Sequence, residues 1–306
     1  MPRPIRGVLP IAHTPFTAGD EIDYASLRKQ IDWAIDVGAD GVCTGMVSEL
    51  LRLTHDERLQ LTDELAAITA GRGCVVMSVG AESVKQALIF TRRAAAAGCD
   101  AVMAVPPISC GVPAEELLHY YASLADASPL PVIVQDASGY VGKSIPISVQ
   151  AELLKRYGNE KILFKPEASP IGPLLSELRD MTSGQARVYE GSGGILLIDS
   201  FRRGIAGTMP GMEYLDAIVP LWQALVRGDD ATAYRLYFPV CALVALQLQA
   251  GLDGFLAIEK YILHQRGLFA TDLRRRPNSW NLDAETQAEV DRLLAILNAE
   301  VKRTPR

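Results

Sequence analysis

Eight short apolar runs, each followed by a segment with helical periodicity, constrain the fold of this chain more than any other feature. Such alternation is typical of βα units that build a parallel sheet. Runs that are apolar almost throughout are expected where both faces of a sheet are covered. The predicted strands cover residues 7–13, 41–45, 74–80, 101–106, 131–136, 161–165, 187–190 and 205–209.

The segments between these runs carry helix stop signals. The predicted helices at 26–37, 84–97 and 152–157 are followed by Gly38, Gly98 and Gly158. Glycine just after the last turn is the usual end of a helix. Eight βα units in about 210 residues predict an α/β fold, a (β/α)8 TIM barrel, whose catalytic groups stand at the C-terminal ends of the strands.

The C-terminal third of the chain has a different pattern. From residue 213 to Arg306 no strand pattern occurs, and amphipathic stretches lie at 214–226, 231–250 and 285–297. We therefore predict a barrel over residues 1–212 and a helical C-terminal extension over 213–306. No low-complexity linker separates the two, so the extension is expected to pack on the barrel.

Charge and composition exclude several classes of protein. The net charge of −6 gives no support for a nucleic-acid partner, and the basic run 274–276 indicates only a solvated turn or a local anion contact. Apolar stretches of signal-peptide or membrane-spanning length are absent from the sequence, which predicts a cytoplasmic protein without a membrane partner. The five cysteines lack ligand spacing, so we expect reduced core thiols and no metal site.

Lys165 is the main candidate for a chemical role. It ends the sixth apolar run, after Ile162, Leu163 and Phe164, where an ammonium group is poorly solvated. Desolvation lowers the pKa of a lysine, and a partly neutral lysine can attack a carbonyl carbon and form a Schiff base. The alternative is a strand-end lysine whose stem is buried while its charged head reaches water. The local sequence leaves both open.

Three segments together resemble the dihydrodipicolinate synthase and N-acetylneuraminate lyase superfamily. They are Lys165 in the sixth strand, Thr14-Pro15-Phe16 after the first, and the turn Gly45–Glu49 with residues 53–58 after the second. The resemblance covers nearly the whole chain. It implies a class I aldolase, lyase or dehydratase that binds a small-molecule 2-keto acid on Lys165. It also implies no cofactor, because the iminium is the electron sink, and a homo-oligomer, either a tetramer or a dimer.

The turn after the second strand is the predicted binding site for the substrate carboxylate. Free backbone N–H groups and the helix dipole can hold an anion between a strand and the next helix. Most members of the superfamily have Gly-Thr-Thr-Gly-Glu here. This chain keeps the backbone donors but loses the hydroxyl relay. The predicted binding residues are Thr14, Gly45, Met46, Val47, Ser48 and Glu49.

Other differences from the superfamily pattern concern residues that transfer protons or bind the substrate. The tyrosine that most members carry on strand five corresponds to Gln135, which cannot titrate and can only orient a neighbouring group. The tyrosine that a neighbouring subunit lends falls near Pro107 and Ile108 and is missing. The arginine that binds the aldehyde substrate's carboxylate corresponds approximately to Tyr140, which disfavours dihydrodipicolinate synthesis.

Short motifs on three strands resemble the branch that contains L-2-keto-3-deoxyarabonate dehydratase. They are residues 134–137 on strand five, Phe164-Lys165-Pro166-Glu167 on strand six and Glu190-Gly191 after strand seven. This resemblance implies dehydration of a 2-keto-3-deoxy sugar acid. A retro-aldolase that releases pyruvate, a dihydrodipicolinate synthase-like condensation and a barrel that binds keto acids without turnover remain alternatives.

Several carboxylates could move protons in such a reaction. Glu167 lies two residues beyond Lys165 and so on the same side of the strand, which makes it the predicted catalytic partner, although it could simply pair with the lysine. Asp136 and Glu190 are further candidates that could instead cap loops or pair with arginines, and Glu49 could be a first-turn acid of a helix.

Polar side chains outside the carboxylates are weaker candidates. Ser192, within a glycine-rich loop, could contact substrate hydroxyls. His13, near the end of the first strand, is more typical of a packed core histidine than of a catalyst. His55, His119 and His264 fall on predicted helices and receive no role.

Overall fold

The computed structural model describes residues 3–304 and contains two compact units. Of the described residues, the first unit comprises 3–6, 53–191 and 199–208. The second comprises 7–52, 192–198 and 209–304.

Within the described residues, strands and helices alternate as the sequence predicts. The strands are β1 (Gly7–Val8), β2 (Gly41–Cys43), β3 (Cys74–Ser78), β4 (Ala101–Ala104), β5 (Val132–Asp136), β6 (Ile162–Pro166), β7 (Tyr189–Glu190) and β8 (Gly207–Thr208). The helices are α1 (Tyr24–Asp36), α2 (His55–Thr69), α3 (Val84–Ala96), α4 (Ala114–Ala127), α5 (Ile147–Tyr157), α6 (Ile171–Met181), α7 (Leu197–Arg202), α8 (Leu215–Arg227), α9 (Asp230–Leu248), α10 (Gly251–Gln265) and α11 (Ala284–Lys302). Two 3-10 turns, Met46–Ser48 and Leu50–Arg52, precede α2.

All eight predicted strands are confirmed, but most are shorter than their apolar runs. The first run illustrates the reason. The ladder of β1 ends at Val8, whereas Leu9, Ile11 and Ala12 beyond it are still buried. Burial keeps these positions apolar although the backbone has left the regular ladder, so an apolar run overestimates strand length.

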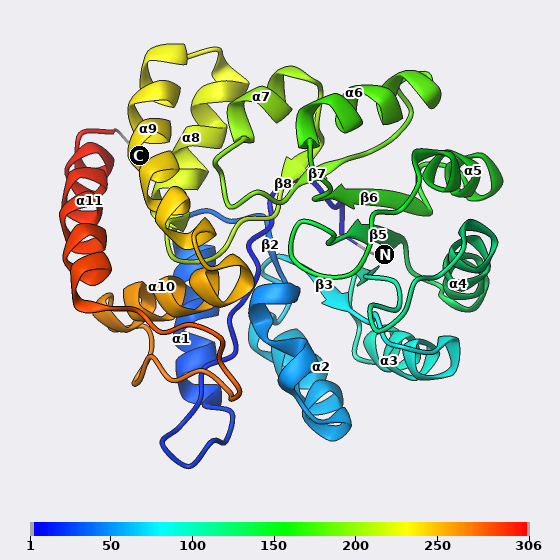
Figure 1. The fold of residues 1–306 in the computed structure, drawn as a ribbon, viewed down its shortest axis with the longest axis horizontal. Coiled ribbons are helices and arrows are strands. Elements are labelled where there is room, and N and C mark those ends of the chain that lie inside the picture. Colours follow the sequence, from blue (N-terminus) through cyan, green and yellow to red (C-terminus); the bar gives the residue numbers. More distant parts are fainter. Residues whose placement is uncertain (1–2, 305–306) are drawn as a thin grey trace. The chain divides into compact units, whose positions relative to one another are not determined.

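The first unit holds a parallel sheet with neighbours in chain order from β3 to β6. The register of β5 and β6 places Gln135 opposite Lys165. A bridge between Phe164 and Val188 continues the order to β7, which pairs in parallel with β8. Helices α2 to α6 pack against their neighbours in sequence, and Figure 1 shows each of them leaving the end of a strand and returning alongside the sheet.

The second unit combines β1, β2 and α1 with the helices of the C-terminal extension. Ala12 donates its N–H to the carbonyl oxygen of Cys43 at 2.7 Å, and Ile11 donates to Pro210 at 2.7 Å. Helix α9 packs against α8, α10 and α11, while α10 packs against the Met46–Ser48 turn. The predicted division of the chain at residue 212 stays a prediction.

Helix α9 is the one helix within residues 3–304 whose length and apolar composition would allow it to cross a membrane. Its place among α8, α10 and α11 makes it a packing helix of the extension and not a membrane span. Helix α10 was not among the predicted stretches. Residues 253–263 are buried without a break, including the charged side chains of Asp253, Glu259 and Lys260.

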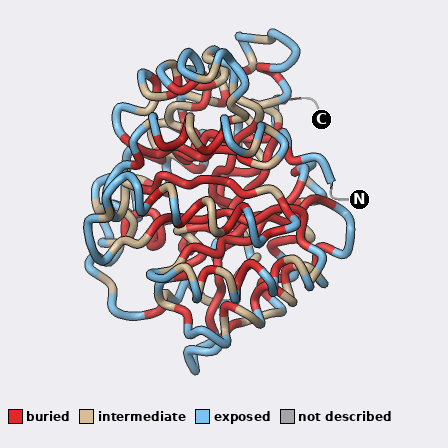
Figure 2. Tube along the Cα trace, turned by 90° about the vertical axis from the view of Figure 1, so that its right-hand side faces the viewer, coloured by how far each residue is buried: buried red, intermediate tan, exposed pale blue. Residues whose placement is uncertain are grey.

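Figure 2 shows the buried residues concentrated along the strands and the inner faces of the helices. One expectation about a particular side chain was wrong. Cys110 is exposed, although Cys43, Cys74 and Cys99 are the buried thiols that the sequence predicts. Of the two alternatives for the basic run, the local anion contact is confirmed, because Arg275 is buried and pairs with Asp20 beside the ring of Phe16.

Candidate functional site

Lys165, Glu167 and Gln135, the three residues predicted to be catalytic, lie together in the first unit. Lys165 stands on β6 and is 3% exposed, and Glu167 directly after β6 is 4% exposed. Lys165 Nζ donates to Glu167 Oε1 at 2.6 Å, and Gln135 Nε2 donates to Glu167 Oε2 at 2.7 Å. Both oxygens of the carboxylate are therefore held, one by a cation and one by a neutral amide.

The sheet explains this arrangement. Residues i and i+2 of an extended segment point to the same side, which places the Glu167 side chain beside that of Lys165. The N–H of Glu167 donates to the carbonyl oxygen of Asp136 at 2.8 Å, so the pairing of β5 with β6 continues past the strand end. Backbone pairing therefore holds Glu167 in place independently of its side-chain contacts.

Burial sets the protonation chemistry of Glu167. Desolvation raises the pKa of this carboxyl group above its usual value, and the nearby charge of Glu190 raises it further, whereas Lys165 and Gln135 act in the opposite direction. The sequence suggested that the ammonium group of Lys165 is poorly solvated. In the structure the Glu167 carboxylate lies 2.6 Å from this amine, so it can balance the charge and is within proton-transfer distance.

Gly191 borders this cluster at the end of β7. A Cβ atom at this position would lie 2.6 Å from Lys165 Nζ and 2.8 Å from Glu167 Oε1. Real Cβ atoms do not approach other atoms so closely, so any larger residue would displace the amine or the carboxylate. Glycine at 191 therefore allows the amine and the carboxylate to take the positions that they have here.

The two other predicted carboxylates of the first unit are engaged by local groups. Glu190 is buried and accepts a hydrogen bond from Thr208 Oγ1 at 3.0 Å. The carboxylate of Asp136 accepts the backbone N–H groups of Ser138 at 3.0 Å and Ile145 at 2.7 Å. Asp136 thus closes the loop after β5, the role that the sequence left open as its alternative.

The predicted carboxylate-binding turn lies in the second unit. Thr14 Oγ1 donates to the carbonyl oxygen of Ser48 at 2.6 Å, and the Gly45 N–H donates to Ser48 Oγ at 3.0 Å. Met46 and Val47 begin the 3-10 turn, where N–H groups have no partner inside a helix. The serine in place of the usual glycine ties the turn together through its hydroxyl.

Glu49 is not a first-turn acid of a helix, because it has a left-handed backbone with φ of 55° and α2 begins only at His55. Its carboxylate forms an ion pair with Lys260 and accepts the N–H of Arg275 at 3.0 Å. Sequence reasoning missed Lys260, since no local pattern connects residues so far apart. In this structure the buried Glu49 carboxylate is therefore engaged by groups of the second unit.

Ser192 and His13 also lie in the second unit. Ser192 Oγ accepts the N–H of Leu196 at 2.9 Å, which organises the glycine-rich loop. His13 is fully buried, as expected for a core histidine, and its Nε2 lies 2.6 Å from Glu259 Oε2. Glu259 and the neighbouring Glu213 were not singled out from the sequence.

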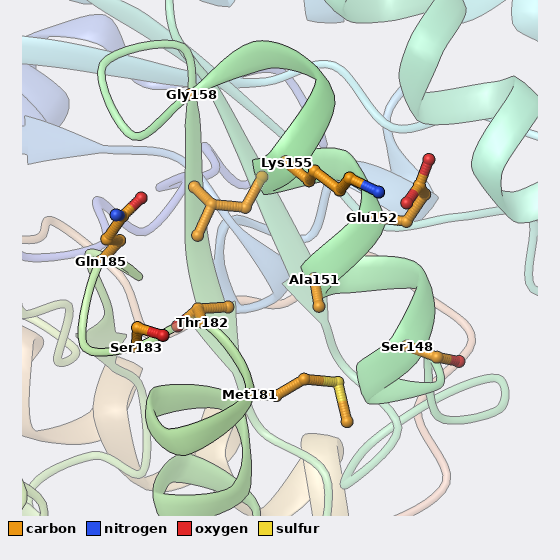
Figure 3. Close-up of a pocket in the computed structure, with 10 residues that line it drawn as sticks. Ser148, Ala151, Glu152, Lys155, Gly158, Met181, Thr182, Ser183 and Gln185 are labelled. Atoms are coloured by element: carbon orange, nitrogen blue, oxygen red, sulfur yellow. The ribbon is translucent and has the colours of Figure 1, made fainter.

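A surface groove of about 560 Å³ lies between α5 and the end of α6. Figure 3 shows Glu152 and Lys155 on one wall and Met181 and Gln185 on the other. Glu152 is paired with Arg156, and the groove contains none of the predicted site residues. Schiff-base chemistry would need a buried amine beside a carboxylate, and the residues that line this groove do not provide one.

The parallel βα order and a buried strand-six lysine beside a carboxylate define the class of protein, a (β/α)8 barrel with a helical C-terminal extension. The sequence profile of the Dihydrodipicolinate synthetase family matches residues 4–297, and the chain belongs to this family, whose members are lyases or aldolases. The resemblance stated from the sequence is thereby confirmed.

Individual relatives differ in their activities. L-2-keto-3-deoxyarabonate dehydratase from Azospirillum brasilense is 30% identical over 300 residues, which cover 95% of this chain and 93% of the relative. The 4-hydroxy-tetrahydrodipicolinate synthase of Methanothermobacter thermautotrophicus is 30% identical over 247 residues, covering 78% of this chain and 86% of the relative.

Solved structures give the same fold. Dihydrodipicolinate synthase from Rhodopseudomonas palustris superimposes with a TM-score of 0.86 at 25% identity, over 96% of this chain and 98% of the other. The 4-hydroxy-tetrahydrodipicolinate synthase of Methylacidiphilum fumariolicum SolV gives a TM-score of 0.87 at 20% identity, over 98% of both chains.

Proposed function

We propose that this protein is a Schiff-base-forming lyase that removes water from a 2-keto-3-deoxy sugar acid. The observation that carries the proposal is the buried group of Lys165, Glu167 and Gln135, in which an amine and a carboxylate are 2.6 Å apart. The similarity to L-2-keto-3-deoxyarabonate dehydratase over 95% of the chain supports the choice of reaction.

The first step is formation of the nucleophile. Glu167 accepts a proton from Lys165, because burial has raised the pKa of its carboxyl group and the two atoms are already in contact. The neutral amine attacks the C2 carbonyl of the keto acid. Glu167 returns that proton to the carbinolamine hydroxyl group, which leaves as water, so that Glu167 is ionised again. The resulting iminium draws electrons from C3 without a metal.

The second step moves a proton at C3. A base removes a C3 proton to give the enamine, whose electrons then expel the C4 hydroxyl group, protonated as it leaves, as water. Glu167 is the assigned base, since its other oxygen is oriented by Gln135. Hydrolysis of the conjugated iminium regenerates Lys165 and releases the dehydrated keto acid.

Gln135 is a positioning residue with a further contact available. Its Nε2 is used by Glu167, but its Oε1 has no hydrogen-bond partner among the residues that the structure describes. A buried carbonyl oxygen without a partner is costly, so a substrate hydroxyl donor at this point would be favoured. The glutamine thus replaces the family tyrosine as an orienting group that does not itself titrate.

The remaining assignments stay predictions. They are substrate contacts by Asp136, Glu190, Ser192 and Thr14, carboxylate binding by residues 45–49, a cytoplasmic location and a homodimer or homotetramer. Each can be tested separately from the reaction assigned to Lys165.

The decisive experiment is a panel of 2-keto-3-deoxy acids with detection of both products. We expect a dehydrated keto acid without pyruvate, whereas pyruvate plus an aldehyde would identify a retro-aldolase. Aspartate semialdehyde with pyruvate should be a poor pair, because Tyr140 and Ile108 replace the family groups that serve it. Efficient dihydrodipicolinate formation would overturn the proposal.

Borohydride trapping separates chemistry from binding. Reduction of the iminium adds a covalent mass at Lys165 even where turnover is slow. A barrel that only binds keto acids would bind the panel compounds and remain unmodified.

A further inference from the structure

Three side chains outside the proposed reaction meet inside the second unit. His13 follows β1, Glu213 lies between β8 and α8, and Glu259 stands on α10. One nitrogen or carboxylate oxygen from each lies within 4.8 Å of those of the other two. None of the three residues is more than 2% exposed, so solvent does not reach the group.

Charge in this cluster is not balanced by its neighbours. The adjacent cation, Lys260, is directed to Glu49 and to the carbonyl oxygen of Leu273. Glu213 and Glu259 are buried close together, and the charge of two such carboxylates must be compensated by protons or by an added positive charge.

Buried polar atoms around the cluster lack partners. Glu213 Oε2, Tyr214 Oη and Gln247 Oε1 have no hydrogen-bond partner within the part of the chain that the structure describes. Gly211 borders the two carboxylates, since a Cβ atom there would collide with Glu213 Oε2 and lie 2.8 Å from Glu259 Oε1. The unpartnered oxygen of Glu213 thus faces the space it shares with Glu259.

An outer hydrogen bond fixes the position of one of the three side chains. Gln247 Nε2 donates to Glu213 Oε1 at 2.9 Å, and such a supporting contact is typical of a carboxylate that binds a metal ion. The Gln30 side chain holds the backbone of His13 twice, accepting its N–H at 2.9 Å and donating to its carbonyl oxygen at 2.9 Å. The second ring nitrogen of His13, Nδ1, has no hydrogen-bond partner among the described residues.

We propose that His13, Glu213 and Glu259 bind a divalent transition-metal ion, Zn²⁺ in the first instance. One imidazole nitrogen with two carboxylate oxygens suits Zn²⁺, and its two charges neutralise the two carboxylates. The ion would replace the hydrogen bond between His13 Nε2 and Glu259 Oε2, which are 2.6 Å apart. These two atoms would have to separate to about 3.3 Å, the spacing of two tetrahedral ligand atoms that each lie about 2.0 Å from Zn²⁺. Because the ligands are buried, the ion is structural and joins three distant segments of the second unit.

This site revises the expectation of a metal-free protein. That expectation rested on cysteine spacing and on histidine and cysteine motifs in the sequence. A site built from residues 13, 213 and 259 has no local motif, so only the fold can bring its ligands together. The proposal is independent of the reaction assigned to Lys165.

The test uses the full-length protein without a histidine tag. The protein is stripped with a chelator and reloaded with Zn²⁺ or Co²⁺. We expect about one equivalent of Zn²⁺ per chain by elemental analysis and visible d–d bands of nitrogen and oxygen ligation in the Co²⁺ form. The Tm should rise with free Zn²⁺ concentration, because an ion that binds only the folded state stabilises it.

Substitutions locate the ion. Glu213→Gln and His13→Gln should each weaken Zn²⁺ binding by more than about 100-fold, whereas Gln247→Leu, which removes only a supporting contact, should cost about 10- to 100-fold. Asp253→Asn is the matched control. This carboxylate of the same unit is held by Arg52 and Ser279, and its loss should leave Zn²⁺ affinity unchanged.

Two results would overturn the proposal. One is wild-type protein that shows neither stoichiometric Zn²⁺ nor Co²⁺ bands after reloading, a result that needs no variant to fold. The other is undiminished affinity in folded Glu213→Gln protein, with folding checked by circular dichroism. Either result would mean that protons, not a metal ion, neutralise these carboxylates.

Discussion

Lys165 and Lys260 are both buried and both paired with a glutamate, but they differ in what surrounds the amine. Lys260 Nζ contacts Glu49, the carbonyl oxygen of Leu273 at 2.8 Å and the ring of Phe16 at 4.3 Å. Lys165 pairs with Glu167 beside Gly191, and the two side chains fill the space that a Cβ atom at position 191 would need.

This difference shows that burial alone does not mark a nucleophile. Burial lowers the pKa of Lys260 to about 8, a value that would suit catalysis, yet the side chain is fully enclosed and its charge is needed by Glu49. Lys165 instead lies near the end of strand β6, the position of catalytic groups in such barrels, and its glutamate partner is also held by the neutral amide of Gln135. Substitutions of the two lysines and their partners should therefore have separate effects on chemistry and on stability.

The largest expected effect is that of Lys165→Arg. Arginine keeps the charge and bulk but is not a usable amine nucleophile near neutral pH, so turnover and borohydride-trapped adduct should both disappear. Mass spectrometry of the intact protein after reduction measures the adduct. An adduct that persists in this variant, at Lys260 or elsewhere, would break the distinction between the two lysines.

Glu167→Gln should have the next largest effect. The amide cannot accept a proton from Lys165 or from C3, so turnover should fall by about 10² to 10⁴, the usual contribution of one general acid or base. Single-turnover trapping then separates its two tasks. Slow adduct formation indicates activation of Lys165, and a normal adduct with slow dehydration indicates the C3 step, whereas near-parental turnover would refute both.

Lys260→Met should affect stability and not chemistry. Removing one partner of a buried ion pair leaves Glu49 uncompensated, which should lower the free energy of unfolding by about 3 kcal/mol. Urea unfolding measures this loss. The double variant with Glu49→Gln should recover part of it, and the folded Lys260→Met protein should still be trapped at Lys165.

The smallest effect concerns pH. Because burial raises the pKa of Glu167 above 4.5, the acid limb of the kcat/KM profile should lie at a higher pH than for an exposed glutamate. Below that pKa the protonated carboxyl cannot accept the Lys165 proton, and the rate should fall about tenfold per pH unit. An acid limb unchanged in Glu167→Gln would assign it to another group.

The fold was largely predictable because its signals are local. Continuous apolar runs mark buried parallel strands, and glycines such as Gly38 and Gly98, both with positive φ, end the helices. Helix α10 was not predicted, although residues 253–263 within it are buried without a break. Strand ends were misplaced because apolar side chains continue past the ladder.

The site was predictable only where its residues are neighbours in the chain or on adjacent strands. Glu167 follows from its spacing to Lys165, and Gln135 from the alignment of strand five. The pairing of Glu49 with Lys260, and of His13 with Glu259, joins residues more than 200 positions apart, which no periodicity records. Their charges could be counted from the sequence, but their partners could not.

The residue at position 191 can be used to decide which related chains share this arrangement, and which positions to vary in a library of variants. A homologue that keeps the strand-six lysine and its glutamate but carries alanine or a larger residue at this point cannot hold both groups as they are held here. Matching the lysine alone would therefore assign this chemistry too widely. In directed evolution of substrate range, position 191 should be left fixed while its neighbours are randomised, since variation there removes the catalyst before it changes the specificity.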